Sequence, residues 1–309
     1  MIQFITPNPS IEHTWVLESI KKGKHQHVSE EIVLPSGKGV NAAFGVHTLG
    51  GQSICTGFLG GLPGKFHEAM MRESGIPSDW TWVDGNTRTA VAVIDRSEPG
   101  RDATLISELG PHISNGKWKE LHKNVLATSC DIAAVCGGMP PVFPPGELKA
   151  VIEDLKKKNV KTWVDTSRDG LGPCLEAVPF GLKINASEAG SISGITVKNS
   201  ESAVKAAEAL IKKGLEIVII TLGEHGAVLV SPETRWTAQP PGIQAVSSVG
   251  SGDAFLAGFL YGFSQNGLMD ECLCMGTAAG SANSLIMGGG RFSLRDYEII
   301  LKEIKIKKI

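Results

Sequence analysis

The chain has 309 residues and a net charge of −2, from 30 basic and 32 acidic side chains. A chain of this length can fold without disulfides or a structural metal, and its balanced charge favours neither nucleic acid nor an acidic membrane as a partner. No apolar run is long enough to span a bilayer, and the start lacks the basic segment of a signal peptide. The six cysteines show no CxxC spacing, so we expect reduced thiols and a cytoplasmic location.

The first half of the chain contains two stretches that read as exposed β structure. They lie at about residues 11–34 and 87–109. In the second stretch, apolar runs at 89–94 and 103–106 are separated by a turn-rich segment at 96–101. We predict that both stretches form a small accessory sheet; the alternative is that they are two edge strands of the main sheet.

The second half alternates between Lys-rich amphipathic segments and short apolar runs. The expected helices are 145–158 and 200–213, and the strands that follow them are 160–165 and 217–221. Asn159 and Gly214 stand where these helices should end. This alternation predicts a parallel sheet with helices on both faces. The last lysines, from Lys302 to Lys308, are expected in a solvated tail.

Residues 249–260 (VGSGDAFLAGFL) are the most informative segment. Gly250 and Gly252 allow a sharp bend, and the apolar helix expected after them offers unpaired N–H groups that suit a phosphate. Asp253 in the first turn can be a simple helix cap. Alternatively, it is a general base that takes a proton from a substrate hydroxyl during phosphoryl transfer. The P-loop, dinucleotide-binding and protein-kinase motifs are missing.

This segment resembles the second signature of the ribokinase-like (PfkB) carbohydrate kinases, and most of all their 1-phosphofructokinase and tagatose-6-phosphate kinase branch. Other segments resemble the branch's motifs in the same order over about 280 residues. They are 6–11 (TPNPSI), 36–43 (SGKGVNAA), 57–61 (GFLGG), 87–88 (TR), 110–111 (GP), 138–140 (GMP), 165–167 (DTS), 183–188 (KINASE) and 221–227 (TLGEHGA). Each motif is weak alone, but their shared order is specific.

The resemblance implies a single α/β domain over residues 1–309, a three-layer αβα sandwich with a mostly parallel central sheet. The strands at 11–34 and 87–109 would form a β-sheet lid over the sugar, which in this family often pairs with the lid of a second subunit in a homodimer. The implied reaction is ATP-dependent, Mg²⁺-assisted phosphorylation of a hydroxyl on a sugar phosphate. Two alternatives stay open: a kinase for an unphosphorylated sugar or nucleoside, and a non-catalytic sugar-phosphate sensor.

The resemblance also implies roles at the phosphate-transfer end. Asp253 would be the base, and the backbone N–H groups of Gly250, Ser251 and Gly252 would form the anion hole. The nucleotide-binding residues would be Asn185, Glu188, Thr221, Gly223, Gly226 and Asn283. Among them, Asn185 and Glu188 would lie near Mg²⁺, partly through water, and Asn283 near the adenine.

At the sugar end, Gly37, Lys38 and Asn41 would hold the substrate, with Glu12 and Gly138 beside it. Lys38 and Arg88 are the candidates for gripping a phosphate already on the sugar, because lysine offers a point charge and arginine a bidentate fork. Read in isolation, they would be a solvated lysine and a strand arginine.

Besides the mild change from alanine to Ser251, four positions depart from the family pattern. Glu12 replaces an aspartate, which shifts the carboxylate by ~1.5 Å, and Ser36 replaces a glycine. Gly138 replaces a serine, and Ile184 replaces a proline. Because the first three lie at the sugar end, we predict that the preferred sugar differs from that of a typical family member.

Overall fold

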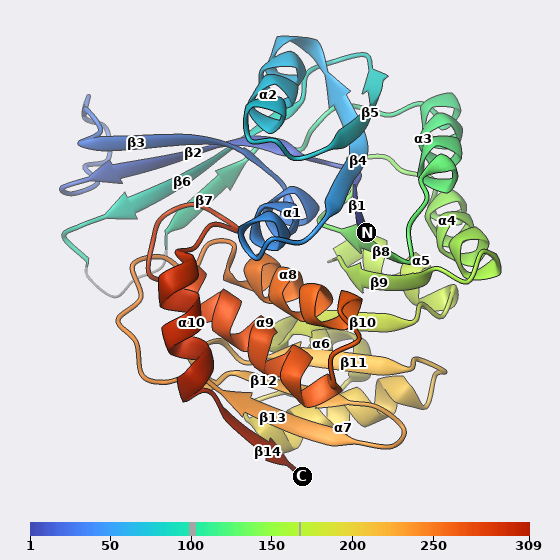
Figure 1. Cartoon of the computed structure of the whole chain (residues 1–309). Coiled ribbons are helices and arrows are strands. Elements are labelled where there is room, and N and C mark those ends of the chain that lie inside the picture. The colour runs from blue at the N-terminus through green and yellow to red at the C-terminus, as the bar shows by residue number, and fades with distance from the viewer. Residues whose placement is uncertain (99–102, 167) are drawn as a thin grey trace.

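The computed structural model describes residues 1–98, 103–166 and 168–309. Ser167 and residues 99–101 of the predicted turn lie outside the described residues. A large sheet carries helices on both faces, and a small sheet projects from one side (Figure 1). The predicted α/β sandwich with a mostly parallel central sheet is confirmed.

The large sheet has ten strands in the order β14-β13-β12-β11-β10-β9-β8-β1-β4-β5. The strands from β11 to β5 in this order run parallel, and β12, β13 and β14 continue the sheet by antiparallel pairing of each strand with the one before it. The bounds are β1 (Ile2–Thr6), β4 (Ser53–Gly60), β5 (Ser78–Val83), β8 (Ile132–Cys136), β9 (Lys161–Asp165), β10 (Gly181–Asn185), β11 (Ile217–Thr221), β12 (Ala227–Val230), β13 (Arg235–Gln239) and β14 (Lys305–Lys308). The predicted strands at 160–165 and 217–221 are β9 and β11.

Helices cover both faces of this sheet. One face carries α1 (Lys38–Thr48), α2 (Gly61–Glu73), α8 (Ser251–Ser264) and α9 (Met269–Asn283), with α10 (Leu294–Glu303) packed on α9. The other carries α3 (Asn115–Ala127), α4 (Pro145–Lys157), α5 (Leu171–Glu176), α6 (Ala186–Ser193) and α7 (Ser200–Ile211). Helix α8 is apolar on nearly all sides because it lies between α1 and α9.

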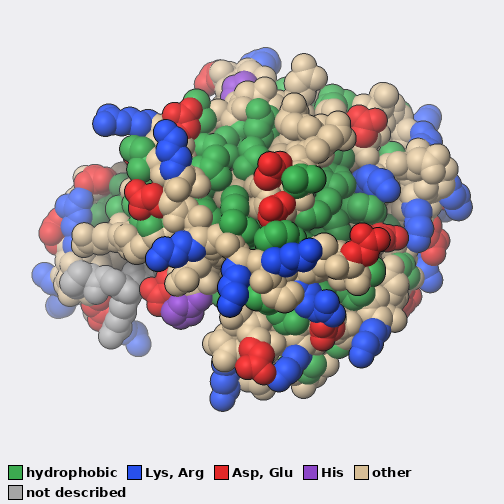
Figure 2. Space-filling view, turned by 60° about the horizontal axis from the view of Figure 1, so that its bottom comes forward, with side chains coloured by type: hydrophobic (Ala, Val, Ile, Leu, Met, Phe, Trp, Pro, Cys, Tyr) green, Lys and Arg blue, Asp and Glu red, His purple; other side chains and the backbone are tan. Residues whose placement is uncertain are grey.

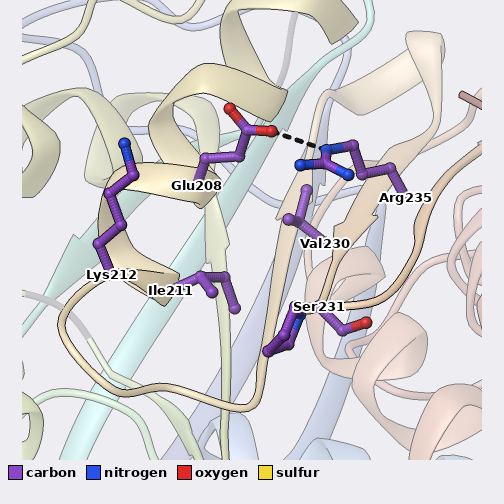
Figure 3. A pocket seen from close by; sticks show the side chains of 7 residues that line it. Glu208, Ile211, Lys212, Val230, Ser231 and Arg235 are labelled. Atoms are coloured by element: carbon purple, nitrogen blue, oxygen red, sulfur yellow. Dashed lines mark hydrogen bonds and ion pairs between the residues drawn. The ribbon is translucent and has the colours of Figure 1, made fainter.

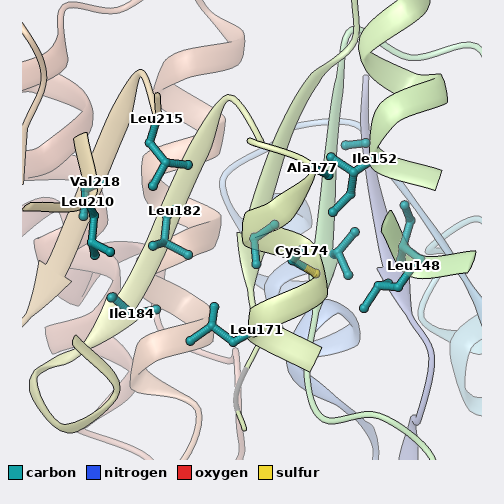
Figure 4. Close-up of a cluster of buried hydrophobic side chains, with 14 of the residues drawn as sticks. Leu148, Ile152, Leu171, Cys174, Ala177, Leu182, Ile184, Leu210, Leu215 and Val218 are labelled. Carbon is teal, nitrogen blue, oxygen red and sulfur yellow. The ribbon is translucent and has the colours of Figure 1, made fainter. Parts of the chain in front are cut away.

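Strand alternation directs one charged residue away from a hydrophobic core. Leu182 and Ile184 of β10 point into the cluster of Figure 4, where α4 contributes Leu148 and Ile152. Since successive side chains point to opposite faces of a sheet, Lys183 faces the other side, toward α8. Ile184, at the position of the family's proline, is fully buried in this core.

Two residues that were predicted to mark helix ends, Asn159 and Gly214, lie just after α4 and α7. Asn159 adopts a left-handed conformation (φ 61°) two residues after α4 ends, and Gly214 does so (φ 102°) after α7. These conformations favour asparagine and glycine, which explains why both residues marked helix ends in the sequence.

The small sheet has four strands in the order β3-β2-β6-β7. They are β2 (Ser10–Leu17), β3 (Glu30–Ser36), β6 (Arg88–Asp95) and β7 (Thr104–Ser107). Strands β2 and β6 pair in parallel, and the other two pairs are antiparallel. Both predicted β stretches therefore join one accessory sheet, and the alternative of two edge strands in the main sheet is wrong.

The predicted solvated tail at the C-terminal lysines is wrong. Lys305–Lys308 form strand β14, which pairs antiparallel with β13, and Lys302 belongs to α10. The unpaired backbone groups of an edge strand offer partners to such a segment whatever its side chains are. The lysine side chains of β14 stay exposed, and the ammonium of Lys308 lies 5.8 Å from the centre of the Trp236 ring.

On the face shown in Figure 2, acidic and basic side chains are interspersed, as the near-zero net charge suggests. Within the described ranges, none of the helices combines the length and apolar character that crossing a bilayer requires.

Candidate active site

Three predicted site segments meet at one edge of the large sheet. Asp165 ends β9, Asn185 ends β10 and Thr221 ends β11. These strands are parallel neighbours, and Asn185 stands directly beside Thr221 in the register. Ligands of open α/β sheets bind at this carboxyl edge, so the geometry supports a common site there.

A buried carboxylate lies between two ammonium groups at this edge. Lys38 Nζ lies 2.8 Å from Asp165 Oδ1, and Lys183 Nζ lies 2.8 Å from Asp165 Oδ2. Burial opposes the charge of Asp165, but the two lysines outweigh it and hold its pKa below the ordinary value. Asp165 and Lys183 belong to matching motifs but were given no role from the sequence.

The ammonium of Lys38 lies close to the carboxylates of Asp165 and Glu188. The backbone of this lysine begins α1 directly after Gly37, and its ammonium lies 3.9 Å from Glu188 Oε1. Burial works against its charge, yet Asp165, Asp253 and Glu188 together raise its pKa above the ordinary value. The three carboxylates therefore keep Lys38 in its charged form.

Arg88 belongs to a different charge cluster. Its Nε donates to the backbone oxygen of Asn8 at 3.1 Å. Burial lowers the pKa of Arg88, and the charges of Glu12 and Glu108 oppose that shift. The two cations predicted to grip one substrate phosphate therefore have separate neighbours, and only Arg88 is grouped with the sugar-end carboxylate.

Asp253 lies in the first turn of α8 and is 7% exposed. Its Oδ2 accepts a hydrogen bond from Asn41 Nδ2 of α1 at 2.8 Å. Among the described residues, Asp253 makes no side-chain bond to the start of its own helix, so capping does not explain it. The sequence placed Asn41 with the sugar, and the structure joins it to the predicted base.

The surroundings of Asp253 shift its ionisation toward neutral pH. Burial and the nearby charge of Asp165 raise the pKa of Asp253 to about 6. Lys38, Lys183 and the Asn41 amide act in the opposite direction. A carboxylate with such a pKa is ionised at neutral pH and still basic enough to accept a proton.

The start of α8 keeps two N–H groups available. Ser251 N–H donates to Ser248 O at 3.1 Å, and Gly250 has the dihedrals (φ 78°, ψ −1°) of the glycine position in a type II turn. For the N–H groups of Gly250 and Gly252, no acceptor occurs in the described part of the chain. The predicted anion hole thus loses one of its three donors to the turn.

Gly252 also lets a cation approach this helix start. A Cβ atom at residue 252 would lie 2.9 Å from Lys183 Nζ. The ammonium of Lys183 therefore lies beside the free N–H groups, and together they form a positive environment that suits a transferring phosphoryl group.

Asn185 and Glu188 cap α6 reciprocally. Asn185 Oδ1 accepts from Glu188 N–H at 2.9 Å, and Glu188 Oε2 accepts from Asn185 N–H at 3.0 Å. This capping box alone accounts for both residue types. It leaves Glu188 Oε1 directed toward Lys38. Among the described residues, no group of three or more His, Cys, Asp and Glu side chains could hold a metal ion.

The segment after β11 forms a tight turn into β12. Gly226 (φ 85°) is required there, since a Cβ atom would fall 1.9 Å from Ala238 O. Gly223 faces open space and lies just after Thr221, beside Asn185. Gly226 therefore shapes the turn, whereas Gly223 borders the region where a nucleotide would lie.

Asn283 lies at the end of α9 and is fully buried. Its Nδ2 donates to Gly288 O at 3.0 Å, and its Oδ1 accepts from Gly290 N–H at 3.2 Å. A Cβ atom at residue 290 would fall 1.9 Å from Asn41 O, so this loop packs against the start of α1. A role of Asn283 near the adenine would act through this loop and stays a prediction.

Arg291 is a candidate site residue that the sequence analysis missed. Its Nη2 donates to Pro35 O at 3.2 Å, its Nη1 lies 3.4 Å from Asn41 Oδ1, and its guanidinium lies 3.6 Å from the centre of the Phe44 ring. Burial lowers the pKa of Arg291 to about 10, although the charge of Glu12 opposes the shift. The run of three glycines before it was the available signal.

The remaining sugar-end residues line the junction of the two sheets. Glu12 is on β2, and its Oε2 accepts from Ser36 Oγ of β3 at 2.9 Å. Gly138 follows β8, and a Cβ atom there would meet nothing within 4 Å. The space for the family's serine side chain at this position is therefore open.

A pocket of about 280 Å³ lies elsewhere, between α7 and the β12–β13 hairpin. Figure 3 shows Glu208 and Arg235 joined across it by a 2.7 Å ion pair. Val230, which lines it, pairs with Val218 near the start of β11. The pocket therefore lies at the opposite edge of the sheet and contains none of the predicted site residues.

Comparison with known proteins agrees with this geometry. The chain is 30% identical over 312 residues to 1-phosphofructokinase of Bacillus subtilis, covering 100% of both chains. It is 26% identical over 314 residues to tagatose-6-phosphate kinase of Staphylococcus epidermidis, again covering 100% of both. Among solved structures, phosphofructokinase-2 of Escherichia coli in complex with substrates and products matches the fold, with a TM-score of 0.91, 23% identity and 98% of each chain covered. The same enzyme has a tetrameric inhibited form, matched with a TM-score of 0.89, 22% identity and 98% of each chain covered.

The sequence model of the pfkB family of carbohydrate kinases matches residues 9–292, which include the small sheet, the large sheet except β1 and β14, and the start of α8. This chain therefore belongs to the pfkB family of carbohydrate kinases.

Proposed function

We propose that this protein transfers the γ-phosphoryl group of ATP to a hydroxyl of a sugar phosphate, with Asp253 as the general base. One observation carries the proposal: Asp253 is a buried carboxylate with a pKa raised to about 6, next to two free N–H groups of its own helix. Members of the family named 1-phosphofructokinase and tagatose-6-phosphate kinase support a sugar phosphate as the acceptor.

In the proposed reaction, Asp253 accepts the proton of the substrate hydroxyl. The hydroxyl oxygen forms a bond to the γ-phosphorus while the bond from that phosphorus to the bridging oxygen of ADP breaks. The N–H groups at the start of α8 and the ammonium groups of Lys38 and Lys183 stabilise the negative charge on the transferring group. Asn41 fixes the orientation of Asp253 through its 2.8 Å hydrogen bond.

The nucleotide would lie over the carboxyl ends of β10 and β11, along the turn at residues 221–227. Asn185 and Glu188 supply oxygen ligands, which suit Mg²⁺, and the ion ordinarily binds through one or two carboxylates, water and substrate phosphates. Glu188 Oε1, which does not take part in the capping box, is the carboxylate oxygen best suited to this role. Bound there, Mg²⁺ would neutralise charge on the nucleotide phosphates.

At the acceptor end, we assign the phosphate of the sugar to Arg88 and a sugar hydroxyl to Glu12. The two side chains are on neighbouring strands of the small sheet, which would act as a lid. Fructose 1-phosphate, tagatose 6-phosphate and fructose 6-phosphate are the substrates to test first. Turnover with a panel of these compounds and free sugars, measured as ADP release, tests the proposal directly.

Arg88→Ala should raise the KM for the sugar phosphate by roughly 10- to 100-fold, because one charged hydrogen-bond partner of the phosphate is lost. The KM for ATP should change little. Arg96→Ala is the matched control, since Arg96 lies just after β6 and pairs with Glu18 and Glu30 on the exposed side. Equal increases in both KM values would contradict the role of Arg88 and favour an unphosphorylated acceptor.

A non-catalytic sensor is the remaining alternative, and the altered residues Glu12 and Ser36 motivate it. Measurable binding of a sugar phosphate without ATP turnover on any member of the panel would favour a sensor. The buried carboxylate of Asp253, with its raised pKa, favours the enzyme, because binding alone needs no general base.

We also propose a homodimer in which the small sheets pair. Strand β7 is one of the two outer strands of the sheet, and its Leu105 and Ile106 are 62% and 61% exposed. Apolar side chains on an exposed edge strand favour association with a second chain. The related Escherichia coli enzyme with a tetrameric form shows that this fold is compatible with assembly.

Ile106→Glu should convert the dimer to a monomer at micromolar concentration, because it places a charge in the apolar contact. Sedimentation velocity measures the change. Leu62→Glu is the control, since Leu62 is 79% exposed on α2, outside the small sheet. A wild-type protein that sediments as a monomer would contradict the proposed dimer.

A further inference from the structure

Glu12 and Ser36 are joined across two strands of the small sheet. In the antiparallel pairing of β2 and β3, Glu12 stands opposite Leu34, and Ser36 stands opposite Ser10. Glu12 and Ser36 are therefore diagonal neighbours on one face of the sheet, a spacing of about 7–8 Å that only longer side chains bridge. Ser36 Oγ lies 2.9 Å from Glu12 Oε2, so the glutamate spans this gap.

The hydroxyl of Ser36 has one proton and two acceptors within reach. Glu12 Oε2 lies at 2.9 Å, and Asn41 Oδ1 lies at 3.3 Å. A carboxylate is the stronger acceptor and here also the nearer one, so the proton goes to Glu12. Asn41 Oδ1 keeps a second donor, since Arg291 Nη1 lies 3.4 Å from it.

The second carboxylate oxygen of Glu12 lacks a partner. Glu12 is 7% exposed, and its Oε1 is fully buried with no hydrogen bond to any described residue. An unsatisfied buried acceptor is costly, so a donor from a bound ligand would be favourable there. The charge of Glu12 opposes the lowering of the pKa values of Arg88 and Arg291 by burial, so both cations lie near this carboxylate.

We propose that Glu12 and Ser36 act as one specificity-determining unit: Ser36 fixes the Glu12 carboxylate so that Oε1 accepts a hydrogen bond from one particular hydroxyl of the sugar phosphate. The inference rests on the proposed function. Ser36 is a positioning residue, and Glu12 contacts the substrate. A carboxylate one methylene shorter cannot reach Ser36 and would turn toward another hydroxyl.

A double-mutant cycle tests the unit, with the wild type, Ser36→Ala, Glu12→Asp and the double variant. The measurement is kcat/KM for fructose 1-phosphate, tagatose 6-phosphate and fructose 6-phosphate. Ser36→Ala should lower kcat/KM for the preferred sugar phosphate by roughly 5- to 50-fold. In the Glu12→Asp background the same change should cost less than about 2-fold. The ratio of kcat/KM between the preferred and the poorer sugar phosphates should fall, and the KM for ATP should not move.

Equal losses from Ser36→Ala in both backgrounds would show independent residues and overturn the inference. So would a loss that is the same for every sugar phosphate, since that marks a purely structural role. If Ser36→Ala does not fold by circular dichroism, Ser36→Gly replaces it in the same cycle.

The failure of the proposed function can be told apart from the failure of this inference. If the wild type turns over no sugar phosphate, the proposed function fails, and the cycle is measured on dissociation constants for the same three compounds by calorimetry. Coupling between the two residues in those constants supports the unit. Additive effects, or no binding of any of the three compounds, overturn it.

Discussion

Asp253→Asn should lower kcat by roughly 10²- to 10⁴-fold and leave the KM for ATP nearly unchanged. Asparagine has the same shape and can still accept the hydrogen bond from Asn41, so the fold and the nucleotide site should persist. It cannot take a proton, so the chemical step is lost. Steady-state rates with the preferred acceptor measure the effect. Asp270→Asn is the matched control, because Asp270 is also in the first turn of a helix, α9.

The pH dependence should identify the same residue. Because the base must be ionised and the pKa of Asp253 is raised to about 6, kcat/KM should fall as the pH drops through about 6. Above that pH, kcat/KM should become independent of pH; the fall below it is the acid limb of the profile. In Asp253→Asn the residual rate should lack this limb. Near-full activity of the variant, or an unchanged limb in it, would show that another group is the base.

Lys183→Met should destabilise the protein by about 1–3 kcal/mol, because buried Asp165 Oδ2 loses its partner while Lys38 still offsets the charge of the carboxylate. Lys183 is 5% exposed and Asp165 is fully buried, so water cannot replace the lost ammonium. Urea unfolding measures the change in the free energy of unfolding. Lys157→Met is the control, since Lys157 pairs with Asp154 at 2.7 Å on the exposed surface.

The same substitution should also change the catalytic pH profile. The charge of Lys183 lowers the pKa of Asp253, so its removal should raise that pKa and move the acid limb of kcat/KM to higher pH. The control variant should keep the wild-type limb. If the variant is destabilised but its kcat/KM falls at the same acid pH as in the wild type, Lys183 has only a structural role and does not affect the pKa of the base.

Local patterns predicted the strands and helices well because those signals lie within short windows. The apolar runs of β9 and β11, and those of β6 and β7 in the small sheet, are such signals. Strand β14 escaped prediction, since its lysines look like a solvated tail. It is a strand because β13 offers an unpaired edge, a property of distant residues.

The candidate site also combines features that the sequence predicted with features that depend on distant residues. Motif order placed Asp253 and Asn41 in one site, but their hydrogen bond joins residues 212 positions apart. The ion pair of Lys38 with Asp165 joins residues 127 positions apart and depends on which strands are neighbours in the sheet. Such pairings follow from topology and are invisible in a single sequence.

Two departures from the family pattern are related by a contact that the sequence alone does not reveal. Glu12 and Ser36 looked like two independent changes, 24 positions apart, at the sugar end. In the structure the longer carboxylate and the added hydroxyl contact each other. Only the register of β2 on β3 reveals that the two changes are related.

The glycine loop at residues 288–290 has a consequence for evolution. Cβ atoms at Gly250 and Gly290 would lie 2.2 Å from Gly289 Cα and 1.9 Å from Asn41 O, so the starts of α1 and α8 approach each other through bare backbone. One added methyl group there would push apart the helices that bring Asn41 to Asp253. A mutational survey would therefore find Gly290 as intolerant as the base, although Gly290 is given no contact with the substrate, and Gly250 would be intolerant for its packing as well as for its N–H group. In this enzyme, the residues that choose the sugar can therefore change more freely during evolution than the glycine positions at which α1 and α8 meet.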